Sequence, residues 1–207
     1  MEFHIDTVPQ STQSALNNIR QIADIQSFYL SGGTALSLQL GHRESEDLDF
    51  FTKTAFQPQI LQQRLLQYGE LQEVMIDDGT LNVFMNKVKL QLLYYPYDLL
   101  ESLIPYNGIY LSSVIDIACT KLITISARGS KKDYIDLYMI LQNMSLQELF
   151  AKLEKKYKNV EYNIPHILKS LVYFNDADEQ PMPRMHIDLT WEYVKSYIIG
   201  QVKDVNF

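Results

Sequence analysis

Two aspartates separated by a single residue, Asp47 and Asp49, have the clearest capacity for chemistry in this sequence. They lie in a stretch that is predicted to form a strand over residues 47–51, and side chains two apart on a strand point to the same face of a sheet. Two carboxylates that lie side by side on one face of a sheet repel each other unless a cation lies between them. Mg²⁺, or Mn²⁺ in its place, is the natural candidate, because Mg²⁺ is bound by one or two carboxylates together with substrate phosphates.

A glycine pair upstream of the aspartates is suited to binding phosphate. Residues 28–31 are predicted to form a short strand that ends on Gly32-Gly33, and Thr34 opens a short helix over residues 34–40. Glycine lets the backbone pass close to a ligand, and the first amides of a helix can receive a phosphate group. Glycine turn, helix and acidic strand together predict a phosphoryl-transfer site. Taken alone, an acidic pair is more simply explained as solvated charge on an exposed strand face.

A second group of charged side chains falls within a short stretch of the second half of the chain: Lys121, Arg128, Lys132, Asp133 and Asp136. Lys121 and Arg128 are seven residues apart, so a helix places them on one face, where the two cations could grip a triphosphate. Asp133 and Asp136 share a face of the next helix. The simpler alternative is a capped helix with a surface ion pair, because Ser130 and Asp133 match a capping-box pattern.

Hydrophobic periodicity predicts the elements that position these residues. In the first half, a helix starting near Ser11 and carrying Ile22 and Ile25 precedes the strand at residues 28–31. After the aspartates come a helix over residues 57–68 and strands over residues 71–76, 80–84 and 88–95. The second half is helical over residues 114–126, 131–142, 146–157, 164–174 and 189–201. The predicted class is α+β, with a mixed sheet in domain 1–110 and a helical domain 111–207 packed on it.

The two groups of residues together resemble a known family. The pattern Gly-Gly-Thr-Ala-Leu at residues 32–36, then Arg-x-Ser-x-Asp-x-Asp-Phe-Phe at residues 43–51, is similar to the AbiEii/AbiGii-type nucleotidyltransferases. Lys121-x6-Arg128, followed by Lys132-Asp133-x2-Asp136, is the second pattern that this family shows. Many members are toxins of bacterial toxin–antitoxin and phage-abortive-infection systems. The resemblance spans residues 20–200 and implies a nucleotidyltransferase fold.

The resemblance also implies a reaction and a set of site residues. The reaction is magnesium-dependent transfer of a nucleoside monophosphate from a nucleoside triphosphate to an acceptor, with tRNA preferred and a protein acceptor as the alternative. A separately encoded antitoxin is the expected partner. The metal ligands are Asp47 and Asp49, and the catalytic set adds Lys121 and Asp133. Nucleotide-binding or site-ordering roles fall to Gly32, Gly33, Thr34, Arg43, Ser45, Arg128, Lys132 and Asp136.

One position departs from the wider pattern of polymerase-like nucleotidyltransferases. Many of these enzymes add a third carboxylate from a later central strand, and the matching strand here carries Gln91. A glutamine can hydrogen-bond but cannot act as a base, which leaves Asp133 as the expected substitute. Two alternatives stay open: a non-catalytic nucleotide- or partner-binding module that retains the fold, and a kinase-like or pyrophosphate-releasing activity at the same metal pair.

Charge and composition limit the remaining function classes. The chain has 18 Lys and Arg against 25 Asp and Glu, a net charge of −7, so contact with nucleic acid is expected to be local. The cationic run over residues 152–158 is either a solvated helix face or a contact with an RNA acceptor. The histidines show no zinc-ligand spacing. With one cysteine, no signal-peptide pattern and no long apolar run, we expect a soluble cytoplasmic protein without a membrane span.

Overall fold

The computed structural model describes residues 2–205, and the chain forms two compact units. Unit 1 comprises the chain up to Tyr97 together with Ser102–Ser113. Unit 2 comprises Asp98–Glu101 and the chain from Val114 onwards. A short excursion of the chain, Asp98–Glu101, therefore belongs to the helical unit although both of its flanks belong to unit 1.

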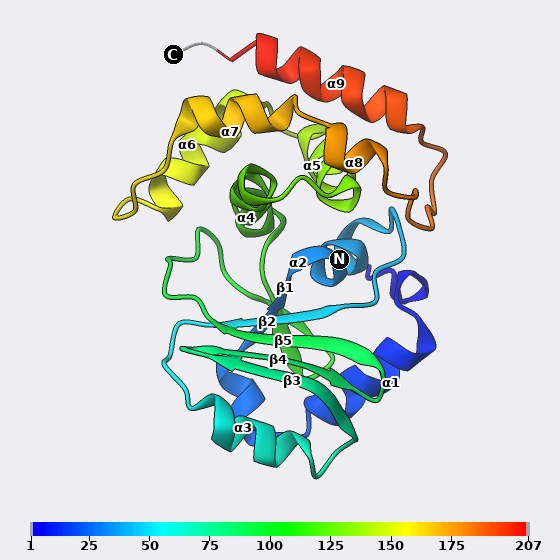
Figure 1. Cartoon of the computed structure of the whole chain (residues 1–207), viewed down its shortest axis with the longest axis vertical. Coiled ribbons are helices and arrows are strands. Elements are labelled where there is room, and N and C mark those ends of the chain that lie inside the picture. The colour runs from blue at the N-terminus through cyan, green and yellow to red at the C-terminus, as the bar shows by residue number, and fades with distance from the viewer. Residues whose placement is uncertain (1, 206–207) are drawn as a thin grey trace. The chain divides into compact units, whose positions relative to one another are not determined.

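Unit 1 is built on a sheet that, within the described residues, has seven strands in the order β3-β4-β5-β2-β1-β7-β6 (Figure 1). The strands are β1 (Tyr29–Ser31), β2 (Leu48–Thr52), β3 (Leu71–Asp77), β4 (Thr80–Met85), β5 (Val88–Tyr94), β6 (Ile104–Tyr106) and β7 (Ile109–Leu111). β2 pairs with β5, and β1 with β7, in parallel, whereas the other neighbours are antiparallel. This mixed sheet, with helices that lie mostly in the second half of the chain, confirms the predicted α+β class.

The sheet has one apolar and one polar face. Leu90 and Leu92 on β5 are almost completely buried, while Gln91 between them is only half-buried. β4 alternates in the same way, and β2 does so over Leu48–Phe50. Successive side chains of a strand point to opposite faces, so the buried residues share one face. The helices α1 and α3 contact β5 and the β3–β4 hairpin and lie on one side of the sheet (Figure 1). They cover the apolar face, which leaves Asp49 on the polar face.

The helical segments of unit 1 are α1 (Gln10–Ile19), α2 (Gly32–Leu40), α3 (Pro58–Leu65) and the 3-10 turns η1 (Ile5–Thr7) and η2 (Ala23–Ser27). Two of these helices, α1 and α3, are shorter than the periodicity predicts, whereas α2 begins two residues earlier than predicted. The prediction that one helix carries Ile22 and Ile25 is wrong, because α1 ends at Ile19, although both residues are almost completely buried. Helical spacing therefore identified core residues but not the end of the helix. The β6–β7 hairpin was not predicted at all.

Unit 2 is helical and is organised around α4. Its helices are α4 (Val114–Ala127), α5 (Lys131–Leu141), α6 (Leu146–Lys156), α7 (Ile164–Leu171), α8 (Asn175–Asp178) and α9 (Trp191–Lys203). α4 contacts α5, α6 and α7, and its residues Ile117, Cys119 and Leu122 are completely buried. Burial raises the pKa of the Cys119 thiol to about 12, so this cysteine packs as a small apolar side chain.

The start of α5 corrects one detail of the sequence analysis. Ser130 is the N-cap of α5 but makes no side-chain cap hydrogen bond, so the predicted capping box with Asp133 is wrong. The backbone N–H of Lys131 donates instead to Oε1 of Gln180, at 2.9 Å, and the Asp133 carboxylate turns to Lys121. A distant amide therefore caps this helix, because the local carboxylate is engaged elsewhere.

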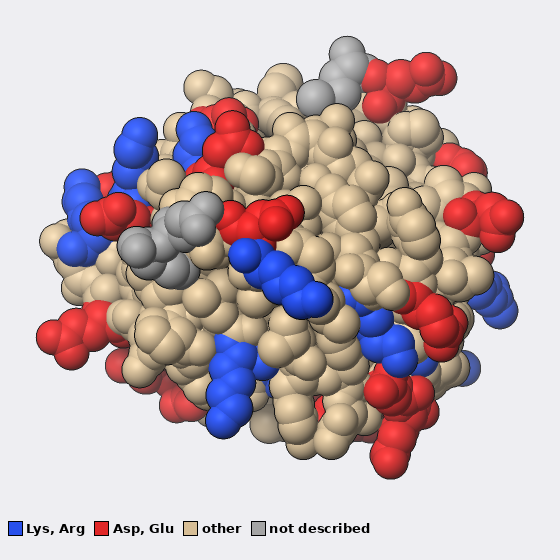
Figure 2. All heavy atoms as spheres, turned by 90° about the horizontal axis from the view of Figure 1, so that it is seen from above, with Lys and Arg blue, Asp and Glu red and all other residues tan. Residues whose placement is uncertain are grey.

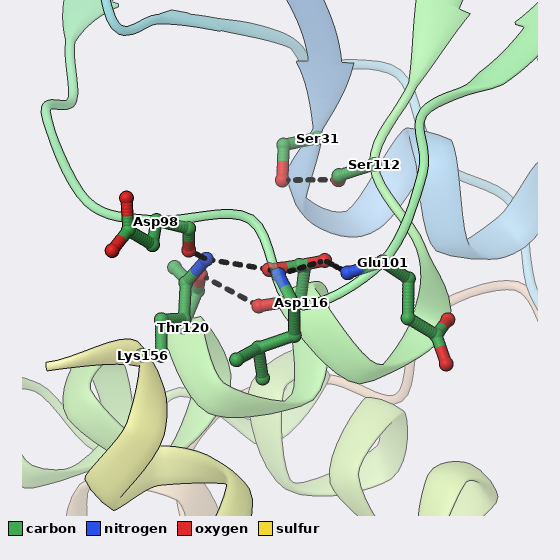
Figure 3. A network of polar contacts seen from close by, with 8 residues as sticks. Ser31, Asp98, Glu101, Ser112, Asp116, Thr120 and Lys156 are labelled. Carbon is green, nitrogen blue, oxygen red and sulfur yellow. Dashed lines mark hydrogen bonds and ion pairs between the residues drawn. The ribbon is translucent and has the colours of Figure 1, made fainter.

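A buried ion pair attaches the excursion Asp98–Glu101 to unit 2 (Figure 3). Nζ of Lys156 lies 2.6 Å from Oδ1 of Asp116, and the two side chains are 1% and 2% exposed. The Asp116 carboxylate also accepts hydrogen bonds from the backbone N–H groups of Leu100 and Glu101. Part of the cationic run at residues 152–158 is thus structural, since Lys156 is buried and Lys158 pairs with Asp98.

None of the helices in the described part of the chain combines the length and the apolar character that a bilayer crossing requires.

The buried pair predicts a large difference between two neighbouring lysines. Lys156→Met leaves Asp116 buried without its cation, and we expect the free energy of unfolding to fall by about 3 kcal/mol. Lys155→Met, at an exposed position, is the matched control and is expected to change it by less than about 0.5 kcal/mol. Urea unfolding of both variants measures the difference. Equal stabilities would show that the Lys156–Asp116 pair does not hold the excursion in place.

Candidate active site

The Gly32-Gly33 turn joins β1 directly to α2, and glycine is favoured at Gly32 by the backbone conformation and at Gly33 by the limited space. Gly32 has φ +64°, a left-handed conformation that favours glycine, and a Cβ at this position would collide with Oδ2 of Asp49. A Cβ at Gly33 would lie 2.5 Å from Nη2 of Arg43 and 3.1 Å from Oγ of Ser45. The turn is therefore packed between an acidic and a basic side chain, with backbone amides at the N-terminus of α2.

Hydrogen bonds fix the first turn of α2 to the chain segment before β2. Oγ1 of Thr34 donates to the backbone oxygen of Asp47 and lies 2.9 Å from Oγ of Ser45. Thr34, Ser45 and Arg43 are all buried, and Nη1 of Arg43 donates to the backbone oxygen of Glu44 at 2.9 Å. These contacts hold the glycine turn and the acidic strand in one fixed relation within unit 1.

The two aspartates lie at the beginning of β2. Asp49 is on the strand, in register with Ser31 of β1 and Gln91 of β5, and Asp47 comes one residue before the strand. Both side chains are half-buried, so they remain accessible to a ligand. The prediction that a strand starts at residue 47 was early by one residue.

These residues fit an oxygen-liganded divalent cation. The two carboxylates are hard oxygen donors, and Mg²⁺ is normally held by one or two carboxylates together with phosphate oxygens and water. Among residues 2–205 no group of three or more Asp, Glu, His or Cys side chains could hold a metal ion. A cation at Asp47 and Asp49 would therefore take most of its remaining ligands from substrate and water.

Unit 2 contains a buried charge cluster of Lys121, Asp133 and Asp136. Nζ of Lys121 lies 2.6 Å from Oδ1 of Asp133 and 2.6 Å from Oδ2 of Asp136, and the three side chains are 9%, 7% and 0% exposed. One cation against two carboxylates leaves a formal charge of −1. Oδ2 of Asp133 is buried and has no hydrogen-bond partner among the described residues. This oxygen is available to a proton or to a donor group of a ligand.

The remaining predicted cations of unit 2 are exposed. Arg128 follows the end of α4 at Ala127, and Lys132 lies in the first turn of α5. Neither makes an ion pair with another residue of the described chain, whereas Lys121 is engaged by Asp133 and Asp136. Lys121 is therefore engaged within unit 2, and the idea that Lys121 and Arg128 together grip a triphosphate stays a prediction. Only Arg128 and Lys132 present their charge to solvent.

Each unit thus gathers its own set of predicted site residues. Unit 1 brings together Gly32, Gly33, Thr34, Arg43, Ser45, Asp47 and Asp49. Unit 2 brings together Lys121, Asp133 and Asp136, with Arg128 exposed just after α4 and Lys132 exposed on α5.

Asn82, which lies in register with Gln91, was not among the predicted site residues. A two-residue turn at Asn86-Lys87, with φ +49° and +69°, could have revealed it, because such a turn fixes the pairing of its strands. The sequence analysis also did not single out Lys131, whose ammonium is held by the backbone oxygen of Gln180. For Lys131 no local sequence signal distinguishes it from the exposed Lys132.

A comparison with protein-family models identifies the family to which the chain belongs. A family model described as "Nucleotidyl transferase AbiEii toxin, Type IV TA system" matches residues 14–192, which contain both groups of site residues. The chain belongs to the AbiEii family of nucleotidyltransferase toxins. AbiEii membership makes this chain a nucleotidyltransferase of a toxin family, with a nucleoside triphosphate as the implied substrate and an antitoxin as the implied partner.

Relatives of this AbiEii chain support the same assignment at the level of fold. An uncharacterised protein of Aquifex aeolicus (strain VF5) is 35% identical over 93% of this chain and 94% of its own length. The structure of a candidate nucleotidyltransferase from Helicobacter pylori has a TM-score of 0.56 at 17% identity, with 94% of each chain covered. MenT4, a nucleotidyltransferase toxin from Mycobacterium tuberculosis H37Rv, has a TM-score of 0.54 at 14% identity, covering 96% of this chain and 87% of its own.

The packing of the glycine turn predicts the effect of a single methyl group. Gly33→Ala places a Cβ against the buried guanidinium of Arg43, so either the guanidinium or the turn must shift, and we expect nucleotide affinity to fall at least tenfold. The matched control is Gly200→Ala in α9, where a Cβ meets no atom within 4 Å. The rise in melting temperature on adding nucleoside triphosphate and Mg²⁺ measures the effect. An equal rise in both variants would remove the phosphate-binding role of the turn.

Proposed function

We propose that this AbiEii chain transfers a nucleoside monophosphate from a nucleoside triphosphate to an RNA acceptor in a magnesium-dependent reaction. The observation that carries the proposal is the contact of the Asp49 carboxylate with the left-handed Gly32 turn at the N-terminus of α2. The turn offers backbone amides to phosphate oxygens, and the adjoining carboxylates offer ligands to a cation. Phosphate and metal sites that adjoin in this way are what transfer from a triphosphate requires.

In this proposal the residues of unit 1 bind the donor nucleotide. Asp47 and Asp49 hold the metal ion, while Gly32, Gly33 and Thr34 receive the phosphates. Arg43 and Ser45 order the turn, because both side chains are buried next to Gly33. When bound, Mg²⁺ supplies positive charge that stabilises the charge developing on the transferred phosphoryl group.

The residues of unit 2 keep, in this proposal, the roles that the family resemblance implies. Arg128 and Lys132 are assigned to the triphosphate on that basis, and both side chains are exposed. Asp133 accepts the proton of the attacking hydroxyl at Oδ2, the oxygen without a partner. Lys121 and Asp136 orient Asp133. In the transfer step the acceptor oxygen bonds to the α-phosphorus, the bond from that phosphorus to the bridging oxygen breaks, and pyrophosphate leaves.

The charge distribution limits any contact with RNA to a small area of the surface. Figure 2 shows acidic and basic side chains interspersed over the face that it displays, with no continuous basic surface. The cationic run at residues 152–158 is weakened as an RNA contact, because Lys156 is buried and Lys158 is paired. Among RNA acceptors we propose tRNA on the basis of the family resemblance, within a toxin–antitoxin or phage-defence system.

A binding-only function is the second candidate. Gln91 stands beside Asp49 where polymerase-like enzymes often place a third carboxylate, and an amide cannot act as a base. A chain that retained the fold but lost turnover would bind nucleotides without transferring them.

The two candidates are separated by label transfer from each α-³²P nucleoside triphosphate to total tRNA with Mg²⁺. We expect label on tRNA with the wild type and a loss of at least about 100-fold in Asp47→Asn/Asp49→Asn, because removing the charges removes the metal site. Glu46→Gln, an exposed neighbour, is the control and should retain transfer. Nucleotide binding without transfer to any RNA or protein acceptor would favour the binding module.

A further inference from the structure

A row of polar side chains crosses the polar face of the sheet in unit 1. Strand register places Asn82 of β4 opposite Gln91 of β5, Gln91 beside Asp49 of β2, and Asp49 opposite Ser31 of β1. Residues directly opposite one another on neighbouring strands point to the same face, at strand spacings of about 4.8 Å. The two carboxamides therefore extend from Asp49 in a line towards the β3 edge of the sheet.

The carboxamides of Asn82 and Gln91 are available to a ligand. Both side chains are half-buried, while their neighbours Leu81, Val83 and Leu90 are buried in the apolar face. Within residues 2–205 neither carboxamide makes a side-chain hydrogen bond or an ion pair. A carboxamide has two N–H donors and a carbonyl acceptor, so two adjoining ones form a neutral surface that can both donate and accept.

The position of Gln91 and Asn82 relative to the glycine turn determines whether they contact the donor nucleotide or the acceptor. β2 has two neighbours, and the phosphate-binding turn follows β1 on one side of Asp49, whereas Gln91 and Asn82 lie on the β5 side. In phosphoryl transfer the attacking and leaving oxygens are roughly in line on opposite sides of the phosphorus. With the donor's β- and γ-phosphates at the glycine turn, the attacking hydroxyl approaches from the side of the carboxamides.

We propose that Gln91 and Asn82 bind the vicinal hydroxyls of the terminal ribose of the acceptor and so select an RNA 3′ end. This inference rests on the proposed function and specifies the chemistry of its acceptor. Each hydroxyl of a 2′,3′-diol both donates and accepts, which a carboxamide satisfies and a carboxylate satisfies only in part. Two side chains on adjacent strands can contact two adjacent hydroxyls, and the 2′-hydroxyl is the group that distinguishes RNA from DNA.

The test compares RNA acceptors that differ only in the last sugar. With the wild type, we expect kcat/KM for an acceptor ending in ribose to exceed that for the same RNA ending in 2′-deoxyribose by at least about tenfold, since a site built to hydrogen-bond a hydroxyl rejects an analogue lacking it. Gln91→Met and Asn82→Leu should reduce this ratio towards one by lowering the rate with the ribose end. The KM for the nucleoside triphosphate should stay unchanged. Gln63→Met, on α3 at the opposite face of the sheet, should retain the full ratio.

Three results overturn the inference. Equal labelling of both acceptors by the wild type, or variants that raise the KM for the donor nucleotide, would show that the carboxamides do not bind the acceptor ribose, while the proposed function stands. Failure of the wild type to label any RNA would remove the proposed function and the inference together. The wild-type ratio does not depend on how any variant folds.

Discussion

The close approach of the Asp49 carboxylate to the Gly32 turn is the constraint on which the arrangement of the site in unit 1 depends. Asp49 lies on β2, Asp47 precedes that strand by one residue, and a Cβ at Gly32 would collide with Oδ2 of Asp49. Carboxylates next to the N-terminal amides of α2 favour a cation together with a phosphate over apolar packing. The buried guanidinium of Arg43 and the bonds of Thr34 make the turn rigid. The strand and the turn are thus shaped by the charge that they are proposed to bind.

Unit 2 contains two buried charge clusters that differ in how completely their hydrogen bonds are satisfied. Lys156 and Asp116 form a pair whose hydrogen bonds are completed by the backbone of the excursion, and its role is structural. Lys121 faces two carboxylates, which leaves a formal excess of negative charge and one oxygen of Asp133 without a partner. A buried polar cluster in which one group lacks a hydrogen-bond partner lowers stability. Titratable groups in such unusual environments are concentrated at functional sites. This contrast separates the proposed catalytic carboxylate from the structural one.

Much of the fold and of the site could be predicted from sequence, for physical reasons. Strands β2 to β5 and helices α4 to α7 have strong periodic patterns, and the Gly-Gly turn and acidic pair are local features. The Ser130–Asp133 capping box was a wrong prediction, because long-range partners, Gln180 and Lys121, outcompete the local bond. For the same reason the sequence could not show which of Lys131 and Lys132 is buried. The role of Asn82 depends on strand register, which becomes visible only after the turn at residues 86–87 is placed.

The most direct test of the central claim is the position of the metal ion. Diffraction from crystals grown with Mn²⁺ and a nucleoside triphosphate carrying a non-cleavable α,β-bridge would locate the ion by its anomalous signal. The account predicts a peak between the carboxylates of Asp47 and Asp49, at about 2.1 Å from their oxygens, with the phosphates over the Gly32-Gly33 turn. Nucleotide and metal bound away from Asp47 and Asp49 would contradict it.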